Sequence, residues 1–325
     1  MRALVTGGSG FIGTNLIEAL INDNNVVLNL DIVPPRNGAH QRFFKQLNIL
    51  DYESLHAQLM EFKPDIIYHM AARTDLDGKT LADYAANTDG LKTLISALKL
   101  CGSLKCIVFA SSRLVCRIGY QPDGEDDYCP DTVYGASKVE GEKIIKSLRT
   151  EIPCRWFIVR PTSIWGPWFD VPYKNFFLSV INGHYLHPKV ERILKSFGYV
   201  GNAVYQMRSL CEVNSSTLDG KVFYMADYPP IDVINMGNLI QIYAEARPLR
   251  RVPIPILRVL ALLGDLLRLA GYKRPPLTSF RLNNLLTPMT YDLDPMEKAV
   301  GALPFSLQQG IAETVDWLKI RGDIN

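Results

Sequence analysis

The sequence predicts an α/β fold, in which a doubly wound parallel sheet is followed by a smaller C-terminal lobe. In the first half of the chain, short apolar runs rich in Val, Ile and Phe alternate with longer helical patterns. A glycine-rich turn links the first apolar run to the first helical pattern, and an aspartate ends the second apolar run. Strands that alternate with helices in this way are typical of βαβ units around a sheet that is buried on both faces.

The alternation extends from residue 3 to residue 161. The predicted strands are 3–6, 25–31, 65–72, 106–112 and 154–161, and the predicted helices are 11–21, 52–62, 93–99 and 133–149. After Pro167 the chain changes to aromatic and proline-bearing loops, a strand-like stretch at 221–227 and mainly helical or irregular segments. We expect a first domain over 1–167 and a substrate lobe over 168–325, with segments near 196–227 returning to the sheet.

Composition and charge narrow the class of protein. The chain has 325 residues and a formal net charge of +2, which is too balanced to indicate a nucleic-acid partner. Its six cysteines form no Cys-x-x-Cys pair, and several lie in apolar segments, where a reduced cysteine acts as a small hydrophobic residue. The N-terminal stretch lacks the apolar segment and cleavage site of a secretory signal. These features predict a protein of the reducing cytoplasm.

The segment from Ile254 to Ala270 is strongly apolar. Arg258, Asp265 and Arg268 interrupt it, so it lacks the run of about 18 apolar residues that a membrane-spanning helix requires. Together with the arginines at positions 247, 250 and 251, it would permit a helix that lies on a membrane surface. A helix that faces the core or a second copy of the chain is the favoured interpretation.

Gly7, Gly10 and Gly13 form the pattern Gly-x-x-Gly-x-x-Gly directly after the first predicted strand. Such a loop lets the backbone approach a pyrophosphate, and the helix that follows presents free N–H groups and the positive end of its dipole to the anion. Asp31 ends the second predicted strand, where a carboxylate accepts hydrogen bonds from the ribose hydroxyls of NAD and repels the 2′-phosphate of NADP. The loop therefore predicts a dinucleotide site that prefers NAD, while Arg36 keeps NADP as an alternative.

Tyr134 and Lys138 are four residues apart in a run that should be helical, which would place both side chains on one face. Tyr185 and Lys189 have the same spacing, but Pro188 lies between them and argues against a helix. A tyrosine with a pKa of about 10 is a poor base at neutral pH unless positive charge stabilises the phenolate, and Lys138 would supply such a charge. Spacing alone does not decide between the pairs, so their context must.

Several short motifs occur in the order found in one known family. They are "VTGGSGFIG" at 5–13, Asp31, "HMAA" at 69–72, Asn87, "FASS" at 109–112, "YGASK" at 134–138, "RPTSIWGP" at 160–167 and "YVGNAV" at 199–204. In this combination the chain resembles the extended short-chain dehydrogenases/reductases, the NAD-dependent epimerase/dehydratase family. The resemblance implies a Rossmann domain, NAD as cofactor, and Tyr134 with Lys138 as the catalytic pair.

The resemblance also implies a role for each residue that matches a family motif. Tyr134 would take the proton from a substrate hydroxyl while hydride passes to NAD, Lys138 would bind the nicotinamide ribose, and Ser112 would donate a hydrogen bond to the reacting oxygen. The implied cofactor contacts are Gly7, Gly10, Phe11, Ile12, Gly13, Asp31, Asn48, Ile49, Ala71, Ala72, Arg73, Asn87, Ser111, Tyr134, Lys138 and Pro161. The implied substrate contacts are Ser112, Arg113, Ser163 and Trp165.

The chain departs from the family's patterns next to the catalytic serine. Dehydratases of the family carry Thr-Asp-Glu where this chain has Ser112, Arg113 and Leu114, so the acid and base that eliminate water are missing and dehydration is disfavoured. A Cys-Arg pair at 116–117 replaces a common Tyr-Gly, and Ser163 replaces an asparagine that often contacts the diphosphate of a sugar nucleotide. These changes leave the residues for oxidation, Ser112, Tyr134 and Lys138, in place. They do not indicate which substrate the enzyme binds.

Three functions are compatible with these residues. The leading interpretation is an epimerase or oxidoreductase that acts on a hydroxyl or ketone of a nucleotide-activated sugar, as in polysaccharide biosynthesis. The alternative is an oxidoreductase similar to the 3β-hydroxysteroid dehydrogenases, because the motifs at 160–167 and 199–204 and the apolar segment at 254–270 are similar to that branch. A non-catalytic NAD sensor is disfavoured, since it would not need Ser112, Tyr134 and Lys138 together.

The remaining expectations concern assembly, metals and specificity. The family resemblance implies a homodimer formed by the helices that contain residues 84–100 and 134–149. No metal is expected, because His184 and His187 have no carboxylate or cysteine partner nearby in the sequence. Side chains that could determine the substrate, or equally stabilise the fold, are Trp165, Trp168, Tyr173, Asn175, Phe176 and Arg281.

Overall fold

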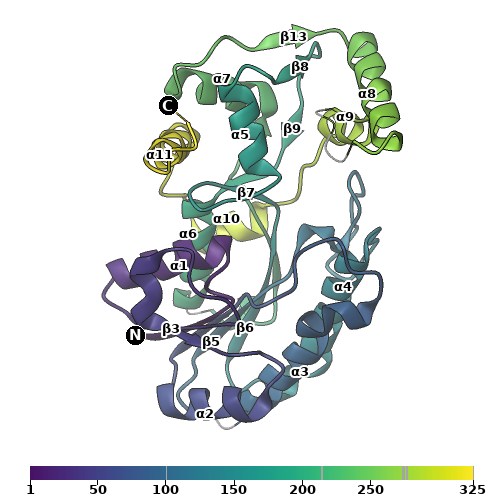
Figure 1. Ribbon diagram of the computed structural model, residues 1–325. Helices are drawn as coiled ribbons and strands as arrows, with labels where there is room; N and C mark the ends of the chain where they lie inside the picture. Colours follow the sequence, from purple (N-terminus) through teal and green to yellow (C-terminus); the bar gives the residue numbers. More distant parts are fainter. Residues whose placement is uncertain (100, 214, 273–274, 276, 325) are drawn as a thin grey trace.

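The computed structural model describes residues 1–99, 101–213, 215–272, 275 and 277–324. Within these residues the central sheet has seven parallel strands in the order β11-β6-β5-β4-β1-β2-β3 (Figure 1). The strands are β1 (Arg2–Thr6), β2 (Val26–Asp31), β3 (Phe44–Gln46), β4 (Ile66–His69), β5 (Cys106–Ala110), β6 (Arg155–Pro161) and β11 (Val222–Met225). The prediction of a doubly wound parallel sheet is confirmed.

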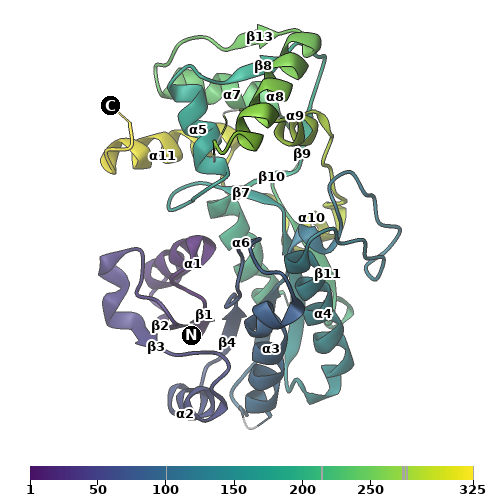
Figure 2. The same ribbon diagram turned by 45° about the vertical axis from the view of Figure 1, so that its right-hand side comes forward.

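Helices cover both faces of this sheet (Figures 1 and 2). On one face, α1 (Phe11–Asn22) and α6 (Val200–Glu212) pack on the sheet residues of a core that includes Val5, Tyr68 and Val108. The other face carries α2 (Tyr52–Phe62), α3 (Ala85–Leu98) and α4 (Val133–Ser147) over a second core. Adjacent strand residues alternate between these cores because successive side chains of a strand point to opposite faces.

The C-terminal lobe lies above the sheet in Figure 1 and is built mainly of helices and short strand pairs. Its helices are α5 (Tyr173–Ile181), α7 (Val233–Tyr243), α8 (Ile254–Leu269), α9 (Ser279–Leu286), α10 (Asp294–Val300) and α11 (Leu307–Ile320). Its strands are β7 (Ser163–Trp165), β8 (Leu186–Pro188), β9 (Leu194–Lys195), β10 (Phe197–Tyr199), β12 (Ile231–Asp232) and β13 (Arg250–Val252). β7 pairs with β10, β9 with β12, and β8 with β13.

Short 3-10 turns link several of these elements. They are Gly38–Phe43, Leu81–Tyr84, Arg113–Val115, Arg149–Glu151 and Ser216–Leu218. In the described part of the chain, every helix is too short or too polar to cross a bilayer.

Two predicted elements differ from the structure by more than two residues at one end. The helix expected at 93–99 begins at Ala85, where a 3-10 turn over Leu81–Tyr84 precedes it and carries a capping box between Thr80 and Asp83. The strand expected at 65–72 ends at His69, and the chain beyond it forms the floor of a large cavity. Both differences bring the backbone of 70–75 to the carboxyl edge of the sheet, next to the glycine loop.

Candidate active site

The glycine loop connects β1 to α1 in a shape that larger residues could not adopt. Gly7 has a φ of +72°, and a Cβ atom there would lie 2.5 Å from the backbone nitrogen of Ala71. A Cβ atom on Gly13 would lie 2.6 Å from the Cα atom of Gly8. The loop is therefore packed against the chain that follows β4, and α1 begins at Phe11 with its first N–H groups turned toward the loop.

A cavity of about 870 Å³ lies over this loop, at the carboxyl ends of β1, β2 and β4. The order of the sheet reverses direction between β1 and β4, and open α/β sheets bind their ligands at such a point. Predicted cofactor residues that line the cavity are Gly7, Gly10, Phe11, Ile12, Gly13, Asp31, Asn48, Ile49, Ala71, Ala72, Arg73, Ser111, Tyr134, Lys138 and Pro161. The size, the glycine cradle and the helix N-terminus fit a dinucleotide.

Asp31 lies at the end of β2 with its carboxylate fixed by the glycine loop. Its Oδ2 atom accepts a hydrogen bond from the backbone of Ser9 at 2.9 Å, and its Oδ1 atom accepts one from Val33 at 3.2 Å. Arg36, which was the reason to consider NADP, pairs with Asp170 at 2.6 Å. Arg36 is thus paired with Asp170 and does not neutralise the Asp31 carboxylate at the ribose end of the cavity. An unneutralised carboxylate there suits NAD better than the 2′-phosphate of NADP.

The predicted catalytic pair lies on the first two turns of α4. Thr132 caps this helix by accepting a hydrogen bond from Gly135 N, and Tyr134 and Lys138 are both buried in the cavity wall. The Nζ atom of Lys138 donates to the carbonyl oxygen of Ala110 at 2.9 Å, and it lies 6.0 Å from the centroid of the Tyr134 ring. Ser112 hydrogen-bonds Tyr134. The three predicted catalytic side chains therefore meet at one point of the cavity.

The alternative pair has a different geometry. Tyr185 precedes β8 and Lys189 follows it, so the two residues are in extended chain and share no helical face. The hydroxyl of Tyr185 lies 3.1 Å from Nδ1 of His187. The context of Tyr134 and Lys138 thus distinguishes them from a pair with the same spacing.

Burial shifts both members of the catalytic pair toward their neutral forms. It raises the pKa of Tyr134 to about 12, an effect that the hydrogen bond with Ser112 opposes. Burial also lowers the pKa of Lys138 to about 8, while the charge of Glu142 acts in the opposite direction. A proton acceptor at Tyr134 therefore needs a further positive charge close to the phenol, which the oxidised nicotinamide of NAD supplies when bound.

A buried ion pair behind the catalytic residues was not predicted. Glu142 and Arg160 are each 1% exposed and their charged groups lie 2.7 Å apart. The Glu142 carboxylate also accepts hydrogen bonds from Ser111 at 2.5 Å and from Tyr128 at 3.0 Å. Glu142 lies one turn beyond Lys138 on the same face of α4. Arg160 is a charged residue within an apolar strand. These two sequence features could have indicated the ion pair.

Asn87 lies outside the main cavity, contrary to its predicted contact with the cofactor. Its side chain accepts a hydrogen bond from Arg73 N at 2.8 Å and donates to Ser137 at 2.9 Å, so it is buried between α4 and the chain after β4. It lines a small cavity of about 20 Å³ together with His69 and Lys138. These hydrogen bonds hold the backbone of Arg73 in place, and the contact of Asn87 with the cofactor stays a prediction. The guanidinium group of Arg73 pairs with Asp75 at 2.8 Å.

Three of the predicted substrate contacts lie outside the wall of the main cavity, so their roles stay predictions. Ser163 and Trp165 are buried in β7, and only Ile164, which points to the opposite side of this strand, lines the cavity. The Trp165 ring lies 5.2 Å from that of Tyr199 and packs in the core. Arg113 hydrogen-bonds Tyr291 outside the cavity wall.

The substrate side of the cavity is largely apolar. Its wall there is formed by Ile164, Phe169, Val171, Tyr173 and Met207, with Asp170 beside them. The other candidates lie elsewhere: Trp168 packs on Trp317, Phe176 on Tyr185, and Arg281 donates to the backbone of Pro275 in the α9 region. Asn175 lies on α5. Sequence reasoning missed Ile164, Phe169 and Met207, because apolar residues in loops and helices give no signal that separates a pocket from a core.

Known proteins are similar to this chain over nearly its full length. The N-acetyl-alpha-D-glucosaminyl-diphospho-ditrans,octacis-undecaprenol 4-epimerase of Escherichia coli O157:H7 is 25% identical over 330 residues, which cover 97% of this chain and 95% of the relative. The 3 beta-hydroxysteroid dehydrogenase/Delta 5→4-isomerase of Mycobacterium tuberculosis (strain H37Rv) is 25% identical over 339 residues, covering 97% and 90%.

Solved structures share the fold. The UDP-glucose 4-epimerase of Thermotoga maritima, solved with UDP-glucose, superposes with a TM-score of 0.73 at 19% identity over 99% of both chains. The UDP-glucuronic acid 4-epimerase of Bacillus cereus, in complex with UDP-glucuronic acid and NAD, gives a TM-score of 0.73 at 18% identity, covering 99% of this chain and 100% of that one.

The family assignment rests on the sequence match rather than on these distant structures. A sequence model of the NAD dependent epimerase/dehydratase family matches residues 3–200, which include the glycine loop, Ser112, Tyr134 and Lys138. The match begins in β1 and ends at the start of α6. The chain therefore belongs to the NAD-dependent epimerase/dehydratase family and is an NAD-dependent enzyme of the extended short-chain dehydrogenase/reductase type.

Proposed function

We propose that the enzyme epimerises a sugar carried by a nucleoside diphosphate, by oxidising one hydroxyl and returning hydride to the other face of the ketone. The observation that carries this proposal is the hydrogen bond between Ser112 and Tyr134 in the wall of the cavity that also contains the glycine loop. The relative from Escherichia coli O157:H7 is named as a 4-epimerase of a sugar on a diphosphate, which supports the same reaction class.

Each catalytic residue has one task in this reaction. Tyr134 takes the proton from the substrate hydroxyl as the C–H bond of the same carbon breaks. NAD, when bound, accepts the hydride from that carbon and gives it back, so the sugar is not oxidised overall. Ser112 holds the reacting oxygen, and Lys138 adds positive charge near Tyr134 while the Ala110 carbonyl fixes its position. When the hydride returns, Tyr134 gives its proton back to the oxygen.

A second candidate is the oxidation of a hydroxyl on a hydrophobic molecule. The apolar wall formed by Ile164, Phe169, Val171 and Met207 favours it, and so does the similarity to the steroid dehydrogenase of Mycobacterium tuberculosis. In that reaction hydride stays on the cofactor, so one NADH forms for each molecule oxidised. Elimination of water remains disfavoured by Arg113 and Leu114, which cannot replace the acid and base of the dehydratases.

The two candidates differ in their products. The purified protein is incubated with NAD and a panel of UDP-, dTDP- and GDP-sugars, the sugars are separated by chromatography, and absorbance at 340 nm is followed. We expect an epimerised sugar, no net NADH, and no activity in a Tyr134→Phe variant. Net NADH with a sugar would indicate a dehydrogenase instead. An inactive sugar panel together with NADH from a 3β-hydroxysteroid would replace the proposal by the second candidate.

The proposal includes assembly and location. As the family resemblance implies, α3 and α4 form the interface of a homodimer, and the enzyme works in the cytoplasm in polysaccharide biosynthesis. Light scattering of the purified chain tests the dimer. An exposed Asp89→Arg and Lys92→Glu double variant on α3 should yield monomers if this interface is correct, whereas an unchanged mass would contradict it.

A further inference from the structure

One side of α8 exposes large apolar side chains to solvent. The helix forms the outer edge of the upper lobe in Figure 1, and six of its residues are between 52% and 84% exposed. We call them the α8 apolar face: Ile256, Val259, Leu262, Leu263, Leu266 and Leu269. Their spacing along the helix places them on the side opposite to Leu257, Ala261 and Gly264, the buried residues.

The buried side of α8 is narrow and closely packed. A Cβ atom on Gly264 would lie 1.8 Å from the carbonyl oxygen of Leu277, so the helix contacts the chain before α9 without space for a side chain. Leu257 and Ala261 pack with Leu282 of α9 in a small core of their own. The packed side of α8 therefore fixes the orientation of the helix, and the apolar face points to solvent.

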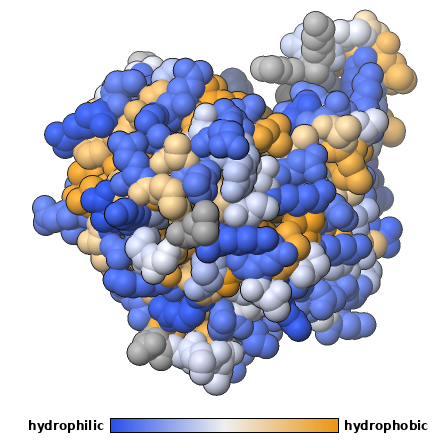
Figure 3. Space-filling view, turned by 90° about the horizontal axis from the view of Figure 1, so that it is seen from below, coloured by the Kyte–Doolittle hydropathy of each residue, from blue (hydrophilic) through white to orange (hydrophobic). Residues whose placement is uncertain are grey.

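Such a concentration of apolar residues is unusual for a soluble surface. The face seen from below the molecule is mainly hydrophilic, and hydrophobic residues occur there in small groups (Figure 3). Scattered apolar residues of that kind need no explanation. A helix whose whole outer side consists of Leu, Ile and Val does need one.

Arginines precede α8, and Arg258 lies at one edge of the apolar face by its spacing along the helix. The segment from residue 247 to residue 268 contains the arginines at 247, 250, 251, 258 and 268, and its acidic residue is Asp265. Asp265 is turned to the protein, where it accepts hydrogen bonds from the backbone of Ser279. Within the described chain, no ion pair is formed by these arginines. Their charges are therefore available to an anionic partner.

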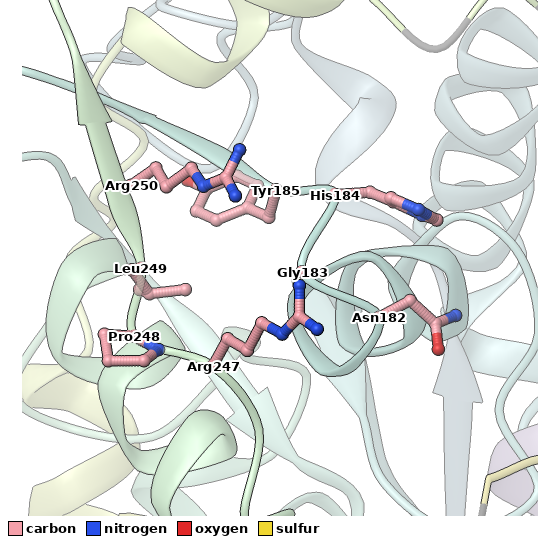
Figure 4. Close-up of a pocket in the computed structure, with 8 residues that line it drawn as sticks. All are labelled: Asn182, Gly183, His184, Tyr185, Arg247, Pro248, Leu249 and Arg250. Atoms are coloured by element: carbon pink, nitrogen blue, oxygen red, sulfur yellow. The ribbon is translucent and has the colours of Figure 1, made fainter.

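Two of these arginines face a common space in the segment that precedes α8. A cavity of about 230 Å³ lies between the end of α5 and β13 and is lined by His184, Tyr185, Arg247 and Arg250. The guanidinium groups of Arg247 and Arg250 both border this space (Figure 4). Planar guanidinium groups bind phosphate in a bidentate manner, and β13 leads directly into α8.

We propose that the α8 apolar face docks on an anionic lipid bilayer, with its leucines in the interface and the arginines on lipid phosphates. A helix that combines a broad apolar face with bordering arginines is what interfacial membrane helices share. A second copy of the chain is a poorer partner, because a two-fold interface over this face would bring the same arginines of both copies together. The inference does not depend on the reaction proposed above.

The docked lobe is the one that covers the catalytic residues. Lys195 donates hydrogen bonds to the carbonyl oxygens of Asn284, at 2.7 Å, and of Thr287, at the end of α9. The charge of Arg113, next to Ser112, acts on Lys195. Lys195 lies on β9 of the same lobe, so docking of α8 would set the orientation of this lobe relative to the bilayer.

The test is vesicle flotation of the full-length protein without substrate. Vesicles contain phosphatidylcholine alone or an equal mixture of phosphatidylcholine and phosphatidylglycerol. We expect the protein to float with the mixed vesicles and to remain in the dense fraction with the neutral ones. A Leu263→Glu/Leu266→Glu variant should lose at least about tenfold in partitioning, because two charges enter the apolar face. An Arg258→Gln/Arg268→Gln variant should lose the preference for the anionic lipid.

Ile320→Glu is the matched control, since Ile320 is 85% exposed on α11, far from α8 in sequence, and this variant should float like the parent. Circular dichroism checks that every variant is folded. The proposal is overturned if the parent protein does not float, or if Leu263→Glu/Leu266→Glu floats as well as the parent. It is also overturned if these substitutions turn a dimer into monomers in light scattering without changing flotation. Epimerase activity has no part in this readout, so either proposal can fail alone.

Discussion

The proposed reaction requires Tyr134 and Lys138 in their charged forms, whereas their surroundings favour the neutral forms. Burial raises the pKa of the tyrosine to about 12 and lowers that of the lysine to about 8. The chain by itself therefore holds a proton donor in place and not a base. A positive charge at the cofactor end of the cavity is what converts it into a proton acceptor.

Replacing Tyr134 by Phe removes the hydroxyl group and keeps the ring in its packing. We expect kcat to fall by a factor of about 10² to 10⁴, and the affinity for NAD, measured by calorimetry, to change little. Tyr185→Phe is the control, because Tyr185 has the same spacing to a lysine but lies outside the cavity. Similar kcat losses in the two variants would contradict the assignment of Tyr134.

The pH profile of activity should report Lys138. A lysine is charged only below its pKa, so kcat/KM should fall as the pH rises through about 8. A Lys138→Arg variant is slower because its geometry differs, but its charge persists, and the fall near pH 8 should be absent. The measurement is kcat/KM for both proteins over a series of buffers. A parent profile that stays flat to pH 10 would show that Lys138 keeps its proton.

At the scale of the residue, most of the predicted cofactor residues line one cavity, whereas several predicted substrate residues lie outside it, and the functions of both sets stay predictions. Gly7, Asp31 and Tyr134 all line the cavity. Each could be recognised because its role demands a particular residue type at a particular position in the sequence. Trp165 was misplaced because a three-residue strand is too short for its alternation to be visible. The direction of a side chain then depends on how the strand pairs, which only the folded chain specifies.

At the scale of the elements, the ion pair between Glu142 and Arg160 joins α4 to β6. Removing one partner leaves an uncompensated charge, so Glu142→Leu or Arg160→Met should each reduce the free energy of unfolding by about 3–5 kcal/mol. The double variant should lose much less than the sum, since no buried charge remains. Urea denaturation of the three variants and the parent measures this coupling. Additive losses would mean that the two side chains act independently.

Some elements could be predicted from the sequence and others not, because only some of them depend on local patterns. Strands and helices up to residue 161 alternate locally, so their patterns are legible in short windows. The small pairs of the upper lobe join distant segments, such as Leu186–Pro188 with Arg250–Val252. No local pattern indicates which partner a three-residue strand will find. For the segment at 254–270 the sequence left a core-facing, a copy-facing and a membrane-facing helix open, since an apolar helix gives the same pattern in all three.

At the scale of the whole molecule, buried titratable groups make the stability depend on pH in opposite directions. Burial lowers the pKa of His69 to about 3, so the folded protein binds fewer protons there than the unfolded chain, and stability is lost as the pH falls below 6.5. Burial raises the pKa of Asp227 to about 7, so the folded protein binds more protons, and this residue gains stability over the same range.

A His69→Gln variant isolates the first effect, because glutamine keeps a polar partner for Thr6, which lies 2.8 Å from Nδ1 of His69. Between pH 8 and pH 5, the parent should lose about 2 kcal/mol more than the variant. The measurement is urea denaturation at both values. Asp227 is present in both proteins, so its contribution cancels in the comparison. Equal losses would mean that His69 accepts a proton in the folded state.

The sheet is completed by a strand that is made late. On the ribosome, β1 to β6 emerge before residues 222–225, and until those arrive β6 has an open edge. The helix that covers one face of the sheet, α6, lies in the same late part of the chain. A nascent chain that already contains the glycine loop, Ser112 and Tyr134 therefore still lacks the outermost strand of its sheet and Met207 of α6, which lines the cavity.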